Sequence, residues 1–219
     1  MRIITVLVLM LVAGTVSAQR ENLSFGPMVG GNYSTIVGIK NIPSITPEYK
    51  LGPTAGLFLN YSIREHFGLS LNALYSEVGA KDYLGTNDLK LNYINVPVLA
   101  TYYFGNDMGT GAIRPKLFLG PNVNFLVGNN DLVSGVKIDF NKVDVGLTAG
   151  IGVNIGLSNQ QWLNIDLRYN RGFMGLYHNP DQLIKPYVQD ARNQYFSLTV
   201  GYSFPLGHYN KTNNRFKRR

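Results

Sequence analysis

Few side chains in this sequence are able to carry chemistry. It contains no cysteine and three histidines, His66, His178 and His208. The lack of cysteine excludes disulfides, thiol nucleophiles and thiolate metal sites. The histidines are far apart, and none has a second histidine at the spacing of a metal site. His178 and Asp181 would pair as acid and base only within a loop, with no nucleophile motif beside them. We therefore expect no catalytic residue, no metal ligand and no cofactor.

Four charged residues form a second candidate set, because they interrupt segments that are mostly apolar or uncharged. They are Lys116, Asp144, Asp166 and Arg168. Each lies at one of the alternate positions that hold the polar residues of its segment. Asp166 and Arg168 are two positions apart and so are neighbours on one face of a strand. A charge that faces lipid at mid-depth costs about 2–4 kcal/mol, so we expect these side chains to point inward. The set predicts a polar network that fills a closed lumen, with a narrow ion path as the alternative.

The segment that contains Asp144 indicates which kind of element positions these charges. Residues 143–157 (VDVGLTAGIGVNIGL) alternate between apolar odd positions and small or polar even positions. A period of two is that of a strand. A sheet facing bulk water would carry Lys, Glu and Gln on its second face, whereas Gly and Asn suit a narrow barrel interior. From this unbroken alternation we expect Ile151 to face lipid and Ser in place of Gly150 to be mild. The glycine-rich face would also leave space for Arg168.

The same pattern recurs and predicts an all-β fold, an eight-stranded antiparallel up-and-down transmembrane β-barrel over residues 19–205. Most segments are near the length that a tilted strand needs to cross a bilayer. The mean hydropathy of −0.04 and the 24 glycines also favour a barrel over a helical membrane protein. The expected strands are residues 25–33, 53–63, 67–75, 93–104, 116–127, 143–157, 163–171 and 195–204.

Connections between these segments alternate in length. Residues 64–66, 106–113 and 158–161 are short, and residues 38–50, 81–90, 128–141 and 172–193 are longer. Outer-membrane barrels have short periplasmic turns and longer extracellular loops, which places both termini in the periplasm. Aromatic residues beside the short turns predict a girdle at one lipid boundary: Tyr61, Phe67, Tyr102, Phe104, Tyr202 and Phe204.

The two ends of the chain have a composition unlike the barrel. Residues 1–18 combine a basic start, a short apolar run and a small-residue cleavage site, which predicts a signal peptide that leaves Gln19 first. Residues 206–219 form a basic tail that holds much of the net charge of +7. We expect this tail to be solvated in the periplasm or near anionic lipid headgroups, and we expect no nucleic acid to bind it.

Several short motifs resemble one known family. They are residues 91–99 (LNYINVPVL), 102–105 (YYFG), Gly120-Pro121, 167–170 (LRYN), 196–198 (FSL) and 201–204 (GYSF). In their order and spacing they resemble the PorT-like family of small outer-membrane β-barrel proteins. The resemblance implies an eight-stranded barrel in the outer membrane of a Gram-negative bacterium. One difference is that residues 205–219 follow Phe204, so the terminal aromatic signal of such barrels would be internal here.

These observations predict a structural or interaction protein and not an enzyme. We expect a monomeric scaffold in outer-membrane lipid that presents extracellular loops, with residues 172–193 as the main candidate surface. The barrel insertion machinery is an expected partner, and a protein partner would bind the loops or the tail. The alternatives are an accessory component of a secretion pathway, a narrow channel, and a soluble lipocalin-like barrel, whose outer face would be charged.

Overall fold

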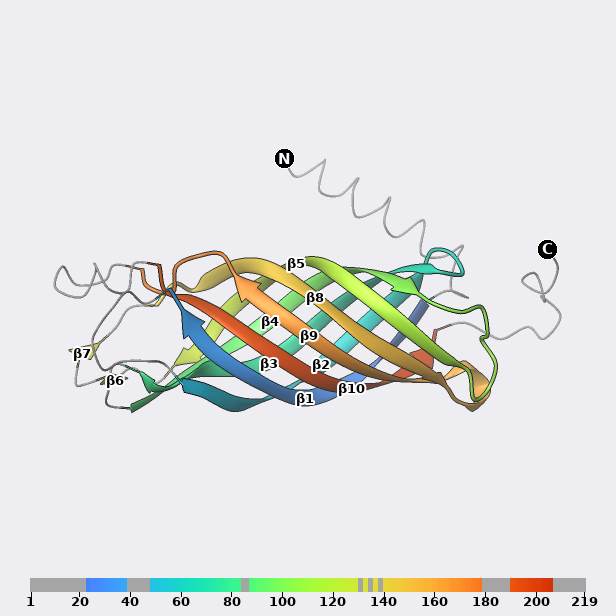
Figure 1. Cartoon of the computed structure of the whole chain (residues 1–219), viewed down its shortest axis with the longest axis horizontal. Coiled ribbons are helices and arrows are strands. Elements are labelled where there is room, and N and C mark those ends of the chain that lie inside the picture. The colour runs from blue at the N-terminus through green and yellow to red at the C-terminus, as the bar shows by residue number, and fades with distance from the viewer. Residues whose placement is uncertain are drawn as a thin grey trace, which may run out of the picture.

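Eight long strands form one closed antiparallel barrel in the computed structural model, which describes residues 23–38, 48–83, 87–129, 132–133, 136–137, 140–178 and 190–206 (Figure 1). The barrel strands are β1 (Leu23–Val37), β2 (Glu48–Ser62), β3 (Phe67–Tyr83), β4 (Asn87–Tyr103), β5 (Ile113–Asn129), β8 (Val143–Gly156), β9 (Trp162–Gly172) and β10 (Arg192–Pro205). Each strand pairs with the next one along the chain, and β10 pairs with β1 to close the barrel. The predicted eight-stranded up-and-down barrel is confirmed.

Two small elements lie in the connections. Strands β6 (Leu132–Val133) and β7 (Val136–Lys137) form a hairpin between β5 and β8. A short 3-10 helix, η2 (Ser158–Gln160), lies in the turn between β8 and β9. In the part of the chain that the structure describes, no helix has the length and apolar character needed to cross a membrane.

Strand β8 shows how the alternating sequence determines the two faces of the wall. Its odd-numbered side chains point outward, and Ile151 is 55% exposed. Its even-numbered polar residues Asp144, Thr148 and Asn154 are buried inside the barrel. The wall is thus apolar outside and polar inside, as the period-two pattern predicts.

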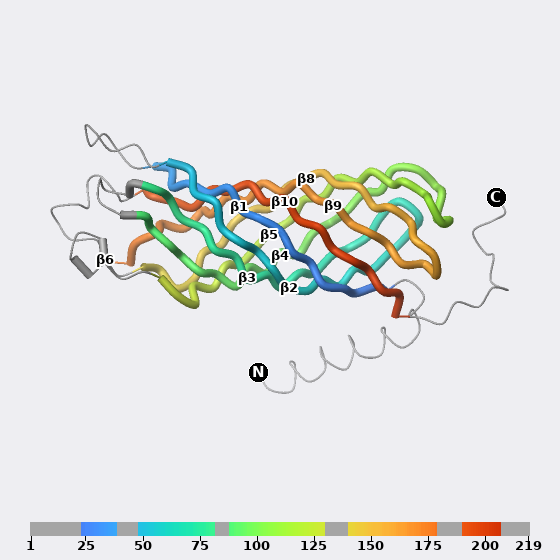
Figure 2. Tube along the Cα trace, turned by 90° about the horizontal axis from the view of Figure 1, so that it is seen from below, coloured from blue at the N-terminus to red at the C-terminus, as the bar shows by residue number. Residues whose placement is uncertain are grey.

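The barrel has two ends, which we call the turn end and the loop end. The turn end contains the connections 63–66, 104–112 and 157–161 and both ends of the barrel chain, where Leu206 N donates to Leu23 O at 2.8 Å. The loop end lies opposite and contains the β6–β7 hairpin (Figures 1 and 2). Residues 1–18 of the expected signal peptide, and the expected tail beyond Leu206, lie outside the described residues.

Seven of the eight barrel strands extend further toward the loop end than predicted, and β3 and β4 extend the most. Strand β3 continues to Tyr83 and β4 begins at Asn87, so most of the expected loop 81–90 is strand. At the described positions of the β3–β4 extension, the polarity of the two faces is reversed. Lys81 and Lys90 are exposed, whereas Ala80 and Leu89 are fully buried inside. A wall that is polar outside and apolar inside is typical of a sheet in water, so the barrel projects beyond its apolar belt at the loop end.

Candidate functional site in the barrel lumen

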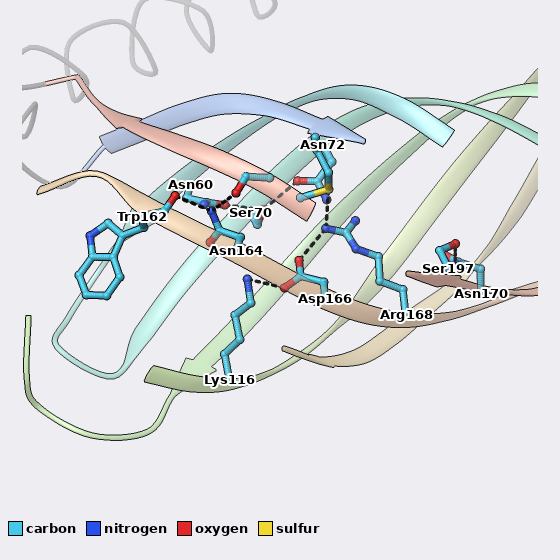
Figure 3. Close-up of polar contacts among 12 residues, drawn as sticks. Asn60, Ser70, Asn72, Lys116, Trp162, Asn164, Asp166, Arg168, Asn170 and Ser197 are labelled. Carbon is cyan, nitrogen blue, oxygen red and sulfur yellow. Dashed lines mark hydrogen bonds and ion pairs between the residues drawn. The ribbon is translucent and has the colours of Figure 1, made fainter. Parts of the chain in front are cut away.

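Three of the four charged residues predicted for the lumen contact one another near its middle. Strand β5 provides Lys116, and β9 provides Asp166 and Arg168. The two oxygens of Asp166 are shared, with Oδ1 2.7 Å from Lys116 Nζ and Oδ2 2.9 Å from Arg168 Nη2. All three side chains are buried, and Figure 3 shows the two cations approaching the carboxylate from different sides. We call these residues the charged cluster.

Neighbours that the sequence analysis missed complete the charged cluster. The Asn72 amide oxygen accepts a hydrogen bond from Arg168 Nη1 at 2.7 Å. Both cations lie over the ring of Phe118, at 5.5 Å for Arg168 and 5.8 Å for Lys116. Arg168 Nη2 also lies 3.1 Å from Met28 Sδ. Asn72 and Phe118 share the inward parity of their strands, but nothing in the sequence predicts which inward residues meet across the barrel.

Glycines of β8 allow these side chains to fit. A Cβ atom on Gly152 would lie 2.3 Å from Asp166 Oδ1 and 2.8 Å from Lys116 Cε. A Cβ atom on Gly150 would lie 2.4 Å from Leu167 O and 2.5 Å from the Phe118 ring. The expectation that Gly150 tolerates Ser is therefore wrong. The inner face is narrow at this position because a backbone carbonyl and an aromatic ring already fill it.

Asp144 does not join the charged cluster. It lies on β8 near the loop end, eight residues from Gly152, or roughly 26 Å along the strand. Its Oδ1 accepts a hydrogen bond from Met174 N at 3.2 Å. Asp144 therefore binds the backbone after β9, and the expected network of four charges divides into a cluster of three and a separate loop contact.

A ring of uncharged polar side chains lies on the loop-end side of the charged cluster, and we call it the polar ring. It passes from Asn122 of β5 to Thr148 of β8, Asn170 of β9, Ser197 of β10 and Asn32 of β1. The four steps measure 2.7, 2.7, 3.4 and 2.7 Å. Asn32 then reaches past β2 and donates to Glu77 O of β3 at 3.1 Å. The polar ring links side chains across the seam between the first and last strands.

An apolar cluster of buried residues lies inside the barrel at the loop end, and we call it the apolar cap. Its members are Ile36, Val78, Ala80, Leu89, Leu91, Tyr93, Phe140, Leu176, Tyr177, Ala191 and Tyr195. The strands provide most of them, whereas Phe140 and Tyr177 come from connections and form a bridge with rings 5.6 Å apart. Asn141 holds the two connections together, because its Nδ2 donates to Gly175 O at 2.7 Å and to Tyr177 O at 3.1 Å.

The turn end contains a buried arginine that lies just outside the predicted strand. Strand β5 begins at Ile113, so Arg114 points inward, where its guanidinium lies 5.0 Å from the centre of the Tyr103 ring. Arg114 Nη2 donates to Glu65 O at 2.5 Å, and His66 Nδ1 lies 3.0 Å from Tyr103 O. These contacts fasten the β2–β3 turn to the neighbouring strands.

The remaining candidates are spread over the surface. His178 is exposed and lies 3.2 Å from Asn141 Oδ1, whereas Asp181 and His208 lie outside the described residues. No group of three possible metal ligands occurs among the described residues. The six aromatic residues expected in the girdle lie on the outer wall near the turn end, where Phe67 and Phe104 each pack edge-on against Tyr102 at 5.0 Å. Tyr202 and Phe204 form another pair at 4.8 Å.

Comparison with known proteins agrees with this architecture. A family model described as the outer membrane protein beta-barrel domain matches residues 17–178. The chain belongs to this family. The family's members lie in the outer-membrane bilayer, which accounts for the apolar belt on the outer wall. The search of curated proteins gave no match.

Solved structures of the family's type share the fold at low sequence identity. The outer membrane protein OprG from Pseudomonas aeruginosa is 15% identical, with a TM-score of 0.54 over 84% of this chain and 96% of that chain. Neisserial surface protein A (NspA) is 15% identical, with a TM-score of 0.52 over 83% of this chain and 97% of that chain. At this identity the likeness concerns the fold of a small outer-membrane barrel.

Proposed function

We propose that this protein is a non-conducting, non-catalytic scaffold of the outer membrane that presents its loop end to a partner. The observation that carries the proposal is the filling of the lumen by the charged cluster, the polar ring and the apolar cap. The cavity beside the charged cluster has a volume of about 10 Å³, enough for roughly one water molecule. Eight-stranded barrels are just wide enough for their side chains to fill.

The orientation in the membrane is part of the same proposal. The loop end faces the outside of the cell and the turn end the periplasm, with residues 1–18 removed as a signal peptide and residues 206–219 left as a periplasmic tail. The reversed polarity of the β3–β4 extension supports this, because a rim that is polar outside stands in water beyond the lipid. The periplasmic girdle is formed by the six aromatic residues near the turn end: Tyr61, Phe67, Tyr102, Phe104, Tyr202 and Phe204.

Planar-bilayer recording tests the closed lumen. The purified protein is expected to show no steady openings, and a porin run in the same membranes provides the positive control. Reproducible conductance steps on the nanosiemens scale would contradict the proposal. Protease added to intact cells tests the orientation. Cleavage is expected near Lys185, while an epitope tag after Arg219 stays protected until the outer membrane is permeabilised.

A role as an accessory in a secretion pathway is the second candidate. The motifs at residues 91–99 and 201–204 favour it, because they resemble the PorT-like family. Such an accessory needs a periplasmic or membrane partner, which photo-crosslinkers placed in the tail would capture. Crosslinks from the tail alone would favour the accessory role, and crosslinks from the loop end alone would favour the outward scaffold.

A further inference from the structure

We propose that the lumen binds a small monovalent anion against the charged cluster, entering from the turn end. The proposal begins with the count of charges. Asp166 is the acid among the residues that line the space beside the cluster, and Lys116 and Arg168 are the cations. Both oxygens of Asp166 are already in contact with a cation. One positive charge is therefore left in excess inside a buried site, where an unpaired charge is strongly disfavoured.

The lining of this space provides the other groups that an anion needs. Asn60, Ser70, Thr101 and Asn164 border it with amides and hydroxyls. The Ser70 hydroxyl already donates to Asn60 Oδ1 at 2.6 Å, and Asn164 Nδ2 donates to Gly201 O at 3.4 Å. Arg168 Nε is buried and has no hydrogen-bond partner. Asp166 and Asn164 Oδ1 are acceptors that limit where an anion can lie, so the cationic nitrogens are its contacts.

Size and access restrict the ligand. The cavity volume of about 10 Å³ admits a single small ion and excludes phosphate esters and larger acids. Its polar lining residues Asn60, Ser70, Thr101 and Asn164 come from the turn-end halves of their strands, while the apolar cap lies at the opposite end. The chemistry matches a monatomic halide such as chloride or bromide, which carries one negative charge in a small volume.

Thermal unfolding of the full-length protein tests the site. The protein is placed in phosphatidylcholine nanodiscs, and its unfolding midpoint is measured in sodium chloride and in sodium gluconate at equal sodium concentration. The wild type is expected to show a saturable rise in chloride, about 5–10 °C at 100 times the dissociation constant. Lys116→Met, which leaves the neutral pair of Asp166 and Arg168, is expected to lose this rise. Lys142→Met removes an exposed charge and is expected to keep it.

Equal midpoints of the wild type in the two salts, or an unchanged chloride effect in Lys116→Met, would overturn the proposal. Crystals soaked in sodium bromide give a second measurement that needs no variant. An anomalous peak within hydrogen-bond distance of Lys116 Nζ or Arg168 supports the site, and its absence refutes it. If chloride stabilises the protein but channel openings are also recorded, the anion site is supported and the proposed closed lumen is contradicted. The two proposals can therefore be refuted independently.

Discussion

Replacing Asp166 with Asn tests whether charge pairing holds the lumen together. Asp166 supplies the carboxylate of the charged cluster, 2.7 Å from Lys116 Nζ and 2.9 Å from Arg168 Nη2. Asn keeps the volume of the side chain but leaves two buried cations side by side. Removing one partner of a buried ion pair costs about 3–5 kcal/mol. The folding equilibrium constant is therefore expected to fall by roughly two to three and a half powers of ten.

Lys116→Met is the matched control, because it removes a charge of the opposite sign from the same cluster. The pair of Asp166 and Arg168 then remains balanced, and Met still packs against Phe118. The variant loses one ion pair and the weak cation–ring contact at 5.8 Å, which we expect to cost no more than about 2 kcal/mol. The double variant is expected to be more stable than Asp166→Asn alone, because it buries one cation instead of two.

Urea titration of the protein folded into lipid vesicles measures these differences. The fluorescence of Trp162, the single tryptophan, and the mobility of unheated samples on gels give two independent signals. Similar losses of stability in the two single variants, or strict additivity in the double variant, would refute the charge-pairing argument.

Three further substitutions test other parts of the barrel in the same assay. Ile151→Arg places a charge on the lipid-facing wall and is expected to cost about 2–4 kcal/mol, whereas Ile151→Val should be nearly silent; a stable Arg variant would show that this face is not in lipid. Gly150→Ser is expected to lower stability because its Cβ would meet Leu167 O and the Phe118 ring, and a mild effect would restore the original sequence-based expectation. Thr148→Val is expected to cost about 1–3 kcal/mol, since Asn122 and Asn170 lose their partner, and Thr148→Ser should retain most of that stability.

The sequence was sufficient to predict the barrel because the period of two repeats over most of the membrane-spanning segments. It also placed Lys116, Asp166 and Arg168 on the inner face, since parity alone separates the two faces. Parity gives no depth along the barrel axis, and for this reason Asp144 was grouped with charges that lie roughly 26 Å away along the wall.

The loop end could not be predicted for a different physical reason. Where the structure describes the side chains of residues 81–90, Lys81 and Lys90 face outward and Leu89 faces inward, which is the reverse of the rest of the wall. The prediction assumed that every strand has its apolar residues on the outer face, so a segment with the opposite arrangement was assigned to a loop. The contacts of Phe118 and Asn72 with Arg168 depend on the stagger of β3, β5 and β9, and no local pattern in the sequence encodes that stagger.

The polar ring has a consequence for how the barrel forms. Its link from Ser197 to Asn32 joins residues 165 positions apart, across the seam where the first strand meets the last. A partly assembled sheet in the bilayer leaves these groups without partners in a medium that has no water to replace them. A barrel that is not yet closed therefore lacks the contact between Ser197 and Asn32, and pairing of the first and last strands completes the polar ring.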